Sequence, residues 1–468
     1  MRPGTRQLLI LLIVACAMFM QNMDSTVIAT ALPVIARSLN ESPLQLNVAI
    51  TCYLLSLAVF IPISGWTADR FGARLVFSSA IVVFTLGSIA CGLSQSLWML
   101  VIARIVQGMG GAMMVPVGRL VLLRTVPRSE LVRAMSFVSV PALIGPIVGP
   151  PLGGLIVTYA SWRWIFFINI PVGVIGVLLI NLVIKNIEEG SPRPFDLGGF
   201  VLTGIGLATL AFGFETLGRG ALPMWLSVAL LGCGGVCVFL YVRHAARVDH
   251  PIIDFALLRI PTYAAATLGG FIFRIGTGAL PFLLPLMLQI GFGLSPLKSG
   301  LLTFAQAAGA MTMKTSVTTV LRWFGFRNVL VGNAAVGASF IFAYAFFRPS
   351  TPHVVIFVLL LAGGFFRSLQ MTSINTLSYA DVPAAMLSRA TSLTSMCQQL
   401  SQSVGVGTGA MILYFLLATH GAEALTPGDF SVALLAVGGI SLSSVPLFFR
   451  MSPDAGAEVS GRGKLASS

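Results

Sequence analysis

Long apolar runs alternate with short polar loops along almost the whole chain. A helix needs about 20 mostly apolar residues to cross the hydrocarbon core of a bilayer. Fourteen such runs are present, and we predict a transmembrane helix in each: 8–33, 46–66, 75–95, 97–118, 135–160, 164–184, 197–217, 223–243, 262–291, 299–319, 328–347, 353–374, 385–418 and 430–449. The pattern therefore predicts an all-α polytopic membrane protein.

The composition supports this prediction. Hydrophobic residues make up 56% of the 468 residues and charged residues only 9%, whereas soluble domains carry about 25% charged residues. The formal net charge of +13 does not indicate a partner nucleic acid, because the basic residues lie singly between apolar runs and form no patch. We expect the lipid bilayer, with its anionic headgroups, to be their partner.

Motifs of common enzyme classes are missing from the sequence. There is no HExxH, no GxSxG and no Walker P-loop. The sequence therefore supports neither metal-dependent hydrolysis nor a process driven by ATP hydrolysis. The six cysteines lie in apolar runs without a CxxC pair, and the four histidines form no cluster. We therefore expect no enzyme activity, no metal site and no cofactor.

Lysine and arginine are distributed unevenly over the predicted loops. The tails and even-numbered loops hold twenty of them, Arg119 and Lys314 included, and the odd-numbered loops hold five. Because cytoplasmic loops are enriched in basic residues, we predict that both termini lie in the cytoplasm. The remaining three, Arg104, Arg274 and Arg367, fall inside predicted spans.

Two short sequences recur 253 residues further along the chain. Ser42-Pro43-Leu44 returns as Ser295-Pro296-Leu297, and Phe71-Gly72-Ala73-Arg74 returns as Phe324-Gly325-Phe326-Arg327. Duplicated halves are typical of secondary transporters, which bind substrate between the halves near the membrane midplane. We predict a six-helix bundle in residues 1–190, two extra helices with linkers in 191–258, a second six-helix bundle in 259–450 and a cytoplasmic tail in 451–468.

Three motifs follow one another in the N-terminal half. GWTADRFGAR runs from Gly65 to Arg74, LVIARIVQGMGG from Leu100 to Gly111, and GPIVGPPLGG from Gly145 to Gly154. They resemble motifs A, B and C of the major facilitator superfamily. Fourteen spans, with MDSTV and ALP in the first span, resemble the EmrB/QacA branch of drug:proton antiporters, and within it the MdtD-type multidrug exporters.

The resemblance implies a major facilitator fold with 6 + 2 + 6 helices, and export in exchange for protons as the coupling ion. It assigns Arg104 to proton coupling, and it assigns a cytoplasmic gate to Gly65, Asp69, Arg70, Gly72 and Arg74. The residues alone also allow a plainer interpretation, in which these charges only fix the topology. In the second copy Arg322 replaces Asp69, so the two halves are not electrostatically equivalent.

The fifth span carries small residues at helical spacing. Gly145, Gly149 and Gly153 recur every four residues and let another helix approach closely. Pro146 and Pro150 lack a backbone donor and favour a bend. This spacing is as typical of static packing as of a moving interface. The resemblance to motif C, which extends to Gly154, implies that the helix takes part in exchange.

Asp24 is a lone carboxylate in an apolar run. A charge in hydrocarbon is costly, so this side chain needs a partner, a proton or water. We predict that Asp24 carries the coupled proton and alternates between solvent and substrate or Arg104. The alternative is a structural carboxylate that caps Gln21, Asn22, Ser25 or Thr26. We expect Arg104 to face the bundle interior, with snorkelling to the interface as its alternative.

Other polar residues within spans are candidates for a substrate cavity. They are Gln21, Asn22, Gln107, Arg274, Arg367, Gln370, Asn375 and Gln398. Each amide could instead bond two helices to each other. One buried acid against three buried bases leaves an anionic compound or a metal chelate open as substrate, beside the usual cationic drugs.

We therefore expect a proton-coupled exporter of small amphipathic compounds or drugs, a monomer that works by alternating access in a bacterial inner membrane. The alternatives are an exporter of an anionic metabolite or metal chelate, a facilitator or importer of the same fold, and a receptor or scaffold that does not transport. A scaffold has no need for buried charges that cost about 2.5–3.5 kcal/mol each. The sequence identifies no partner in an efflux assembly.

Overall fold

The chain forms helices throughout the part that the structure describes. The computed structural model describes residues 3–41, 43–184, 194–219, 222–249, 251–294, 296–420 and 425–460, and no residue in these ranges lies in a β-strand. The apolar runs explain this, because a segment in hydrocarbon must satisfy its own backbone N–H and C=O groups. The protein is a multi-pass membrane protein.

The first six predicted spans correspond to eight helices. Ser96 caps the fifth of these helices, by accepting a hydrogen bond from the backbone N–H of Met99. The helices are α1 (Pro3–Ser38), α2 (Pro43–Phe60), α3 (Ser64–Phe71), α4 (Ala73–Gly92), α5 (Leu97–Thr125), α6 (Leu131–Tyr159), α7 (Trp164–Phe167) and α8 (Asn169–Val183), with the 3-10 turns η1 (Ile61–Ile63) and η2 (Arg128–Glu130).

The rest of the chain adds the extra pair and the C-terminal helices. The extra pair is α9 (Leu197–Arg219) and α10 (Met224–Ala245). The remaining elements are η3 (Phe255–Arg259), α11 (Pro261–Ala264), η4 (Ala265–Gly269), α12 (Gly270–Gly278), α13 (Leu280–Leu286), η5 (Met287–Gly291), α14 (Pro296–Ala345), α15 (His353–Leu377), η6 (Ala384–Met386), α16 (Leu387–His420), α17 (Pro427–Leu442), α18 (Val445–Phe449) and α19 (Ala457–Ser460).

Twelve stretches of the described residues are long and apolar enough to cross a membrane. The fourteen predicted spans differ from them at two places: Lys298–Ala345 is one stretch, and α6 is not among the twelve. Within the long stretch, α14 is broken at Gly325, inside the loop predicted between two spans. The number of crossings and the domain boundaries stay predictions, and residues 185–193 of the predicted linker and 461–468 of the predicted tail lie outside the described residues.

The repeated Phe-Gly turn has the same backbone geometry in both halves. Gly72 has φ 84° and ψ 139°, and Gly325 has φ 73° and ψ 164°. Glycine adopts positive φ without the strain that a side chain brings. The chain can therefore turn sharply between α3 and α4, and again inside α14, which supports the predicted duplication.

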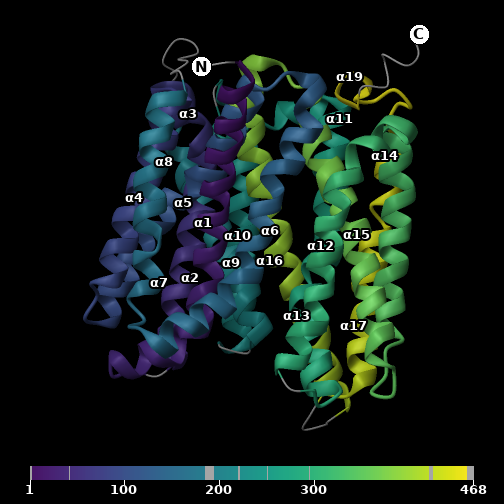
Figure 1. Cartoon of the computed structure of the whole chain (residues 1–468). Coiled ribbons are helices and arrows are strands. Elements are labelled where there is room, and N and C mark those ends of the chain that lie inside the picture. The colour runs from purple at the N-terminus through teal and green to yellow at the C-terminus, as the bar shows by residue number, and fades with distance from the viewer. Residues whose placement is uncertain are drawn as a thin grey trace.

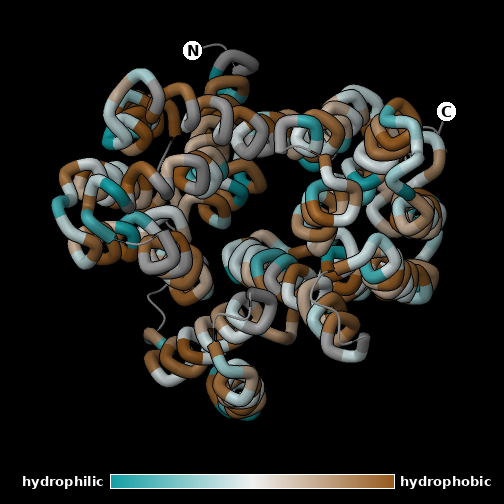
Figure 2. Tube along the Cα trace, turned by 90° about the horizontal axis from the view of Figure 1, so that it is seen from below, coloured by the Kyte–Doolittle hydropathy of each residue, from teal (hydrophilic) through white to brown (hydrophobic). Residues whose placement is uncertain are grey.

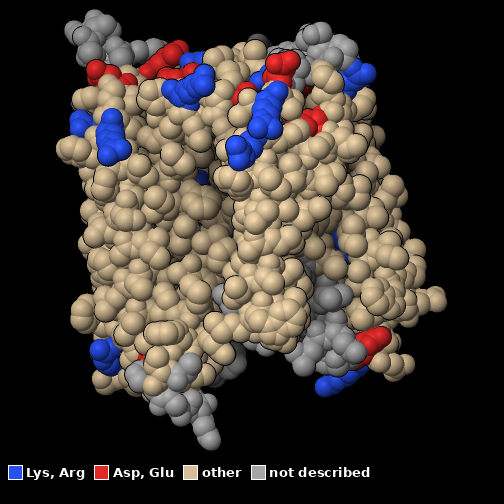
Figure 3. Space-filling model, turned by 180° about the vertical axis from the view of Figure 1, so that it is seen from behind, with Lys and Arg blue, Asp and Glu red and all other residues tan. Residues whose placement is uncertain are grey.

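The beginning of α1 and the short helix α19 lie at the same end of the molecule, together with α3 and α11 (Figure 1). We call this the terminal end, and the opposite end, where α7 and α13 lie, the distal end. On the face drawn in Figure 3, charged residues gather at the two ends, and the broad belt between them shows very few. In the view from below, hydrophobic residues are spread over the helices of the whole molecule (Figure 2), as is typical of helices in lipid.

Apolar packing joins the two halves at the terminal end. One buried cluster includes Val14 and Phe77 of the N-terminal half together with Phe326 and Leu377 of the C-terminal half. Two other clusters each stay within one half: one includes residues of α1, α5 and α7, and the other includes residues of α13, α14 and α17. The two clusters that stay within one half include α7 and α13, which lie at the distal end. The cluster that both halves share therefore lies nearer the terminal end.

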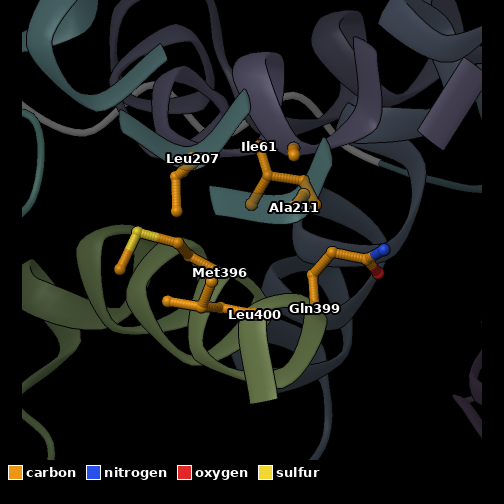
Figure 4. A pocket seen from close by; sticks show the side chains of 7 residues that line it. Ile61, Leu207, Ala211, Met396, Gln399 and Leu400 are labelled. Carbon is orange, nitrogen blue, oxygen red and sulfur yellow. The ribbon is translucent and has the colours of Figure 1, made fainter. Parts of the chain in front are cut away.

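Helix α9 lies between the two halves. It packs against α2 and α16, and α10 packs on α9. A small pocket marks this seam (Figure 4), lined by Ala58, Ile61, Leu207, Ala211, Met396, Gln399 and Leu400. All but Gln399 are apolar, so α9 covers the seam between α2 and α16 with apolar side chains.

Candidate functional site

The Asp24 carboxylate accepts three hydrogen bonds in the interior of the N-terminal half. Arg104 Nη1 donates to Asp24 Oδ2 at 2.6 Å, Gln107 Nε2 donates to Oδ1 at 2.8 Å, and Asn169 Nδ2 donates to Oδ1 at 3.2 Å. Asp24 is only 3% exposed, and its three donors are fully buried. The predicted neighbours Asp24 and Arg104 therefore form a buried ion pair.

The network extends to helix α4. Gln107 Nε2 also donates to Ser88 Oγ at 2.6 Å, and Asn169 Nδ2 donates to the same oxygen at 3.0 Å. Gln107 Oε1 accepts from Arg104 Nη1 at 2.6 Å and from Cys91 Sγ at 3.7 Å. The charged pair on α1 and α5 is thus fixed by side chains of α4 and α8.

The geometry of α5 explains why Arg104 and Gln107 act together. The two residues are three positions apart, so they lie on one face of the helix. Arg104 is seven residues from the first residue of α5, or about 10 Å at 1.5 Å per residue. Because α5 begins at the distal end and Asn169 opens α8, the network lies nearer the distal than the terminal end. A fully buried Arg104 excludes snorkelling.

The structure does not show Asp24 capping its neighbours on α1, which was the alternative to a proton carrier. Asn22 Nδ2 donates to the Met18 carbonyl at 2.8 Å, and Ser25 Oγ donates to the Asn22 carbonyl at 2.8 Å. Thr26 Oγ1 likewise donates to the carbonyls of Asn22 and Met23. These side chains bond the backbone of their own helix, whereas the hydrogen bonds described for Asp24 come from α5 and α8.

Helix α6 lies close to α1 at the residue before Asp24 and again two residues after it. A Cβ atom at Gly145 would lie 3.0 Å from the Met23 backbone nitrogen, and one at Gly149 would collide with the Thr26 side chain. Gly153 is buried. The side-chain surroundings of Pro146, Pro150 and Gly154 lie outside the described residues. The motif C stripe therefore packs directly on the helix that carries Asp24.

At the terminal end, Asp69 contacts both halves. Ser388 Oγ of α16 donates to Asp69 Oδ2, and Arg124 of α5 lies 3.4 Å from Asp69 Oδ1. Among the described contacts, the cation that pairs with Asp69 is Arg124 and not Arg74 of the same motif. Arg74 is half-buried and Arg70 is exposed, and neither forms an ion pair with another described residue.

Other contacts between the halves surround Asp69. Ser64 Oγ lies 2.9 Å from Ser392 Oγ, and a Cβ at Gly65 would lie 2.7 Å from that oxygen. Arg128 Nη1 donates to the Ala380 carbonyl at 2.8 Å. The motif A segment thus meets the first turns of α16 at the terminal end.

The C-terminal half holds cations within its helices. Arg274 Nη2 donates to Asn375 Oδ1 at 2.9 Å, and Gln398 Nε2 donates to the same oxygen at 2.7 Å. Lys314 donates to Thr372 Oγ1. Arg367 is half-buried and forms no hydrogen bond or ion pair with another described residue. None of these three cations has a carboxylate partner among the described residues.

Several positions need correction against the sequence predictions. Lys314 and Arg119, which we placed in loops, lie inside α14 and α5, and Arg119 is close enough for its charge to repel that of Arg274. Gln370 is fully buried and bonds Asn333 Nδ2 at 2.9 Å, so it joins α15 to α14. Gln107 is likewise buried in the Asp24 network. Both glutamines therefore join neighbouring helices in this structure.

Three residues of the network were missed from the sequence: Ser88, Cys91 and Asn169. Asn169 gave a usable signal, because it is a single amide in the apolar run WIFFINIPVGV. Ser88 and Cys91 gave none, because serine and cysteine also occur in transmembrane helices that merely pack. Gln21 and Asn22 are half-buried, and the Gln21 Oε1 atom has no hydrogen-bond partner among the described residues.

The sequence profile of the Major Facilitator Superfamily matches residues 14–406. The chain belongs to this family. It is therefore a membrane transporter and not an enzyme, as the three motifs indicated. The buried Asp24 network and the motif A contacts are parts of a major facilitator protein.

Curated relatives are similar over most of their length. The chain is 42% identical over 401 residues to the "Putative multidrug resistance protein MdtD" of Salmonella heidelberg (strain SL476), covering 86% of this chain and 85% of the relative. It is 43% identical over 403 residues to the protein of the same name in Salmonella typhimurium (strain LT2), with the same coverage. These similarities confirm the resemblance to the MdtD-type branch.

Solved structures share the fold at low sequence identity. The crystal structure of the human organic anion transporter MFSD10 (TETRAN) gives a TM-score of 0.69 at 13% identity, covering 94% of this chain and 99% of that one. The proton:xylose symporter XylE, bound to 6-bromo-6-deoxy-D-glucose, gives a TM-score of 0.68 at 14% identity, covering 99% of both chains. These two likenesses show that this chain has the major facilitator fold.

Proposed function

We propose that this major facilitator protein is a proton-coupled exporter of small amphipathic compounds, acting by alternating access in a bacterial inner membrane. The observation that carries the proposal is the Asp24–Arg104 pair, 2.6 Å apart and buried among donors from α5 and α8. The relatives named as multidrug resistance proteins support export of such compounds.

Protonation of Asp24 would change the network directly. An ionised carboxylate only accepts hydrogen bonds, and here its oxygens face three donors. A protonated carboxyl would point its own O–H at a group that also donates, and Arg104 would lose its negative partner. Proton uptake would therefore rearrange α1 against α5 and α8, which supplies a route from a proton to helix movement.

The contacts between the halves support alternating access. At the terminal end, α3 and η2 of the N-terminal half bond α16 and the segment before it, and a shared apolar core lies beneath. Opening this end would require breaking the Asp69–Ser388 contact. We infer that Gly65, Asp69, Arg70, Gly72 and Arg74 belong to a gate, closed here, and that α6 slides on α1 when it opens.

We infer that the terminal end faces the cytoplasm. The predicted loops and tails of that side carry twenty lysine and arginine residues against five on the other side, as cytoplasmic loops do. With fourteen crossings arranged as 6 + 2 + 6, both termini would lie in the cytoplasm. The structure would then represent a state closed to the cytoplasm.

A second candidate is an exporter of an anionic metabolite or a metal chelate. Arg274, Lys314 and Arg367 lie inside the C-terminal helices without a carboxylate partner among the described residues, and Arg119 adds a fourth positive charge close to Arg274. Buried ionisable groups in membrane helices usually pair or mark a substrate pathway. An anionic group of the substrate would supply the missing partner.

Flux into proteoliposomes tests the proposal. The purified full-length protein is reconstituted, and uptake of ethidium and of a carboxylated dye of similar size is measured with a pH gradient imposed in either direction. A coupled exporter accumulates its compound against a concentration gradient only when protons flow the opposite way. A facilitator equilibrates the compound whatever the gradient, and a scaffold gives no more flux than protein-free vesicles.

A further inference from the structure

The Arg104 guanidinium is only partly satisfied by hydrogen bonds. Its Nη1 atom donates to Asp24 and Gln107, whereas Nε and Nη2 have no hydrogen-bond partner among the described residues. The residue is fully buried, so bulk solvent does not supply the missing acceptors. Something other than a hydrogen bond must hold most of this cation.

The ring of Tyr53 lies against that cation. Arg104 Cζ is 4.2 Å from the centroid of the Tyr53 ring and 6.0 Å from that of Phe166. Tyr53 is fully buried on α2, and its hydroxyl has no hydrogen-bond partner among the described residues. The side chain therefore offers Arg104 its aromatic face, and its O–H takes part in no described bond.

The aromatic face acts differently on the two members of the ion pair. It carries the negative end of the ring quadrupole, so it attracts the Arg104 cation and gives no such attraction to the Asp24 anion. When Asp24 is ionised, the ring meets a pair with no net charge. When Asp24 is neutral, the ring faces a lone cation, and the attraction between ring and cation stabilises the protein more.

We propose that Tyr53 is a positioning residue that holds the Arg104 guanidinium in place while Asp24 is neutral. The ion pair can then form again in the same geometry when Asp24 loses its proton. This inference rests on the proposed proton coupling at Asp24. The other groups around Asp24 are Cys91 and Ser88 of α4, Gln107 of α5 and Asn169 of α8, and α6 has no ionisable side chain but Tyr159 between residues 134 and 159.

A double-mutant cycle tests the proposal without any substrate. Asp24→Asn imitates the neutral state, and each ring variant is made in both the wild-type and the Asp24→Asn protein. The measurement is the apparent thermal unfolding midpoint of the full-length protein in detergent at one scan rate. Tyr53→Leu should lower this midpoint by about 2 °C more in the Asp24→Asn background than in the wild type.

Two variants separate the ring electrostatics from packing. Tyr53→Phe should leave both midpoints unchanged, because the lost hydroxyl has no described partner. Tyr53→pentafluorophenylalanine keeps the shape but reverses the charge of the ring face, so it should reproduce the extra loss in the Asp24→Asn background. Phe166→Leu, at the more distant ring, serves as control and should act equally in both backgrounds.

The proposal would be overturned if Tyr53→Leu and the fluorinated ring each lowered the unfolding midpoint by the same amount in the wild-type and Asp24→Asn proteins. A larger decrease in the wild type would overturn it as well. Transport gives a readout that packing alone would not move: ethidium export driven by a pH gradient should survive Tyr53→Phe and fall several-fold with the fluorinated ring. If Asp24→Asn still exports with the gradient, the proposed coupling fails while the thermal cycle still decides the role of Tyr53.

Discussion

Asp69→Asn is the most direct perturbation of the gate. Asp69 accepts a hydrogen bond from Ser388 across the halves and lies 3.4 Å from Arg124 within its own half. Its side chain is 23% exposed, so solvent screens the charge only in part. Asparagine keeps the size and one acceptor but removes the charge. The closed terminal end should therefore lose stability relative to the open one.

The size of the effect follows from these contacts. A hydrogen bond to a charged group contributes about 1.5–3 kcal/mol, and a neutral one about 0.5–1.5 kcal/mol. Replacing one by the other at Ser388 should cost the closed state about 1–2 kcal/mol, a shift of about 5- to 30-fold in the ratio of closed to open protein. Turnover should fall while the amount of protein in the membrane stays near normal.

Distances between spin labels measure this shift. In a protein without its native cysteines, Leu75→Cys with Trp323→Cys reports on the terminal end, and Trp98→Cys with Val354→Cys on the distal end. All four positions are at least half exposed, from 53% at Leu75 to 73% at Trp98. In Asp69→Asn, a larger fraction of molecules should show a long distance between the terminal labels and a short distance between the distal labels.

Arg133→Gln is the matched control, because Arg133 lies outside the proposed gate at the start of α6, is exposed and forms no ion pair with another described residue. It should leave both distance distributions unchanged. Unchanged distributions in Asp69→Asn, together with normal turnover, would refute the gate and leave Asp69 a role in topology alone.

Two further predictions concern buried charges. Arg104→Gln leaves the Asp24 carboxylate without its cation, which should cost about 3–5 kcal/mol of stability and lower the thermal unfolding midpoint; adding Asp24→Asn should recover most of that loss, and an additive double variant would mean that the pair does not interact. Arg274→Gln and Arg367→Gln should reduce transport of an anionic dye more than that of a matched cationic one, and equal losses for both dyes, or none, would exclude the anion hypothesis.

The helices were predictable because hydrocarbon leaves the backbone few alternatives. Each of the fourteen apolar runs coincides with helix in the structure, and the shared turn at Gly72 and Gly325 could be predicted from a repeated four-residue sequence. The count of crossings could not be settled in the same way. Run length alone does not tell a helix that turns back at Gly325 from one that continues.

The site was predictable only where charge made it so. Asp24 and Arg104 were found because a charge in hydrocarbon is costly, and their pairing followed. The partners of Asp69 could not be read from the sequence, since Arg124 and Ser388 are brought there by the packing of α5 and α16 on α3. Gln370 and Gln107 looked like cavity residues, because an amide that bonds two helices has the same sequence signature as one that meets a substrate.

The central claim is that Asp24 carries the coupled proton, and proton movement driven by substrate tests it most directly. Proteoliposomes are loaded with a pH-sensitive dye, no pH gradient is imposed, and an ethidium gradient is applied. The wild-type protein should move protons opposite to the compound. Asp24→Asn should move none, even if ethidium still exchanges across the membrane. Equal proton movement in the two proteins would contradict the account.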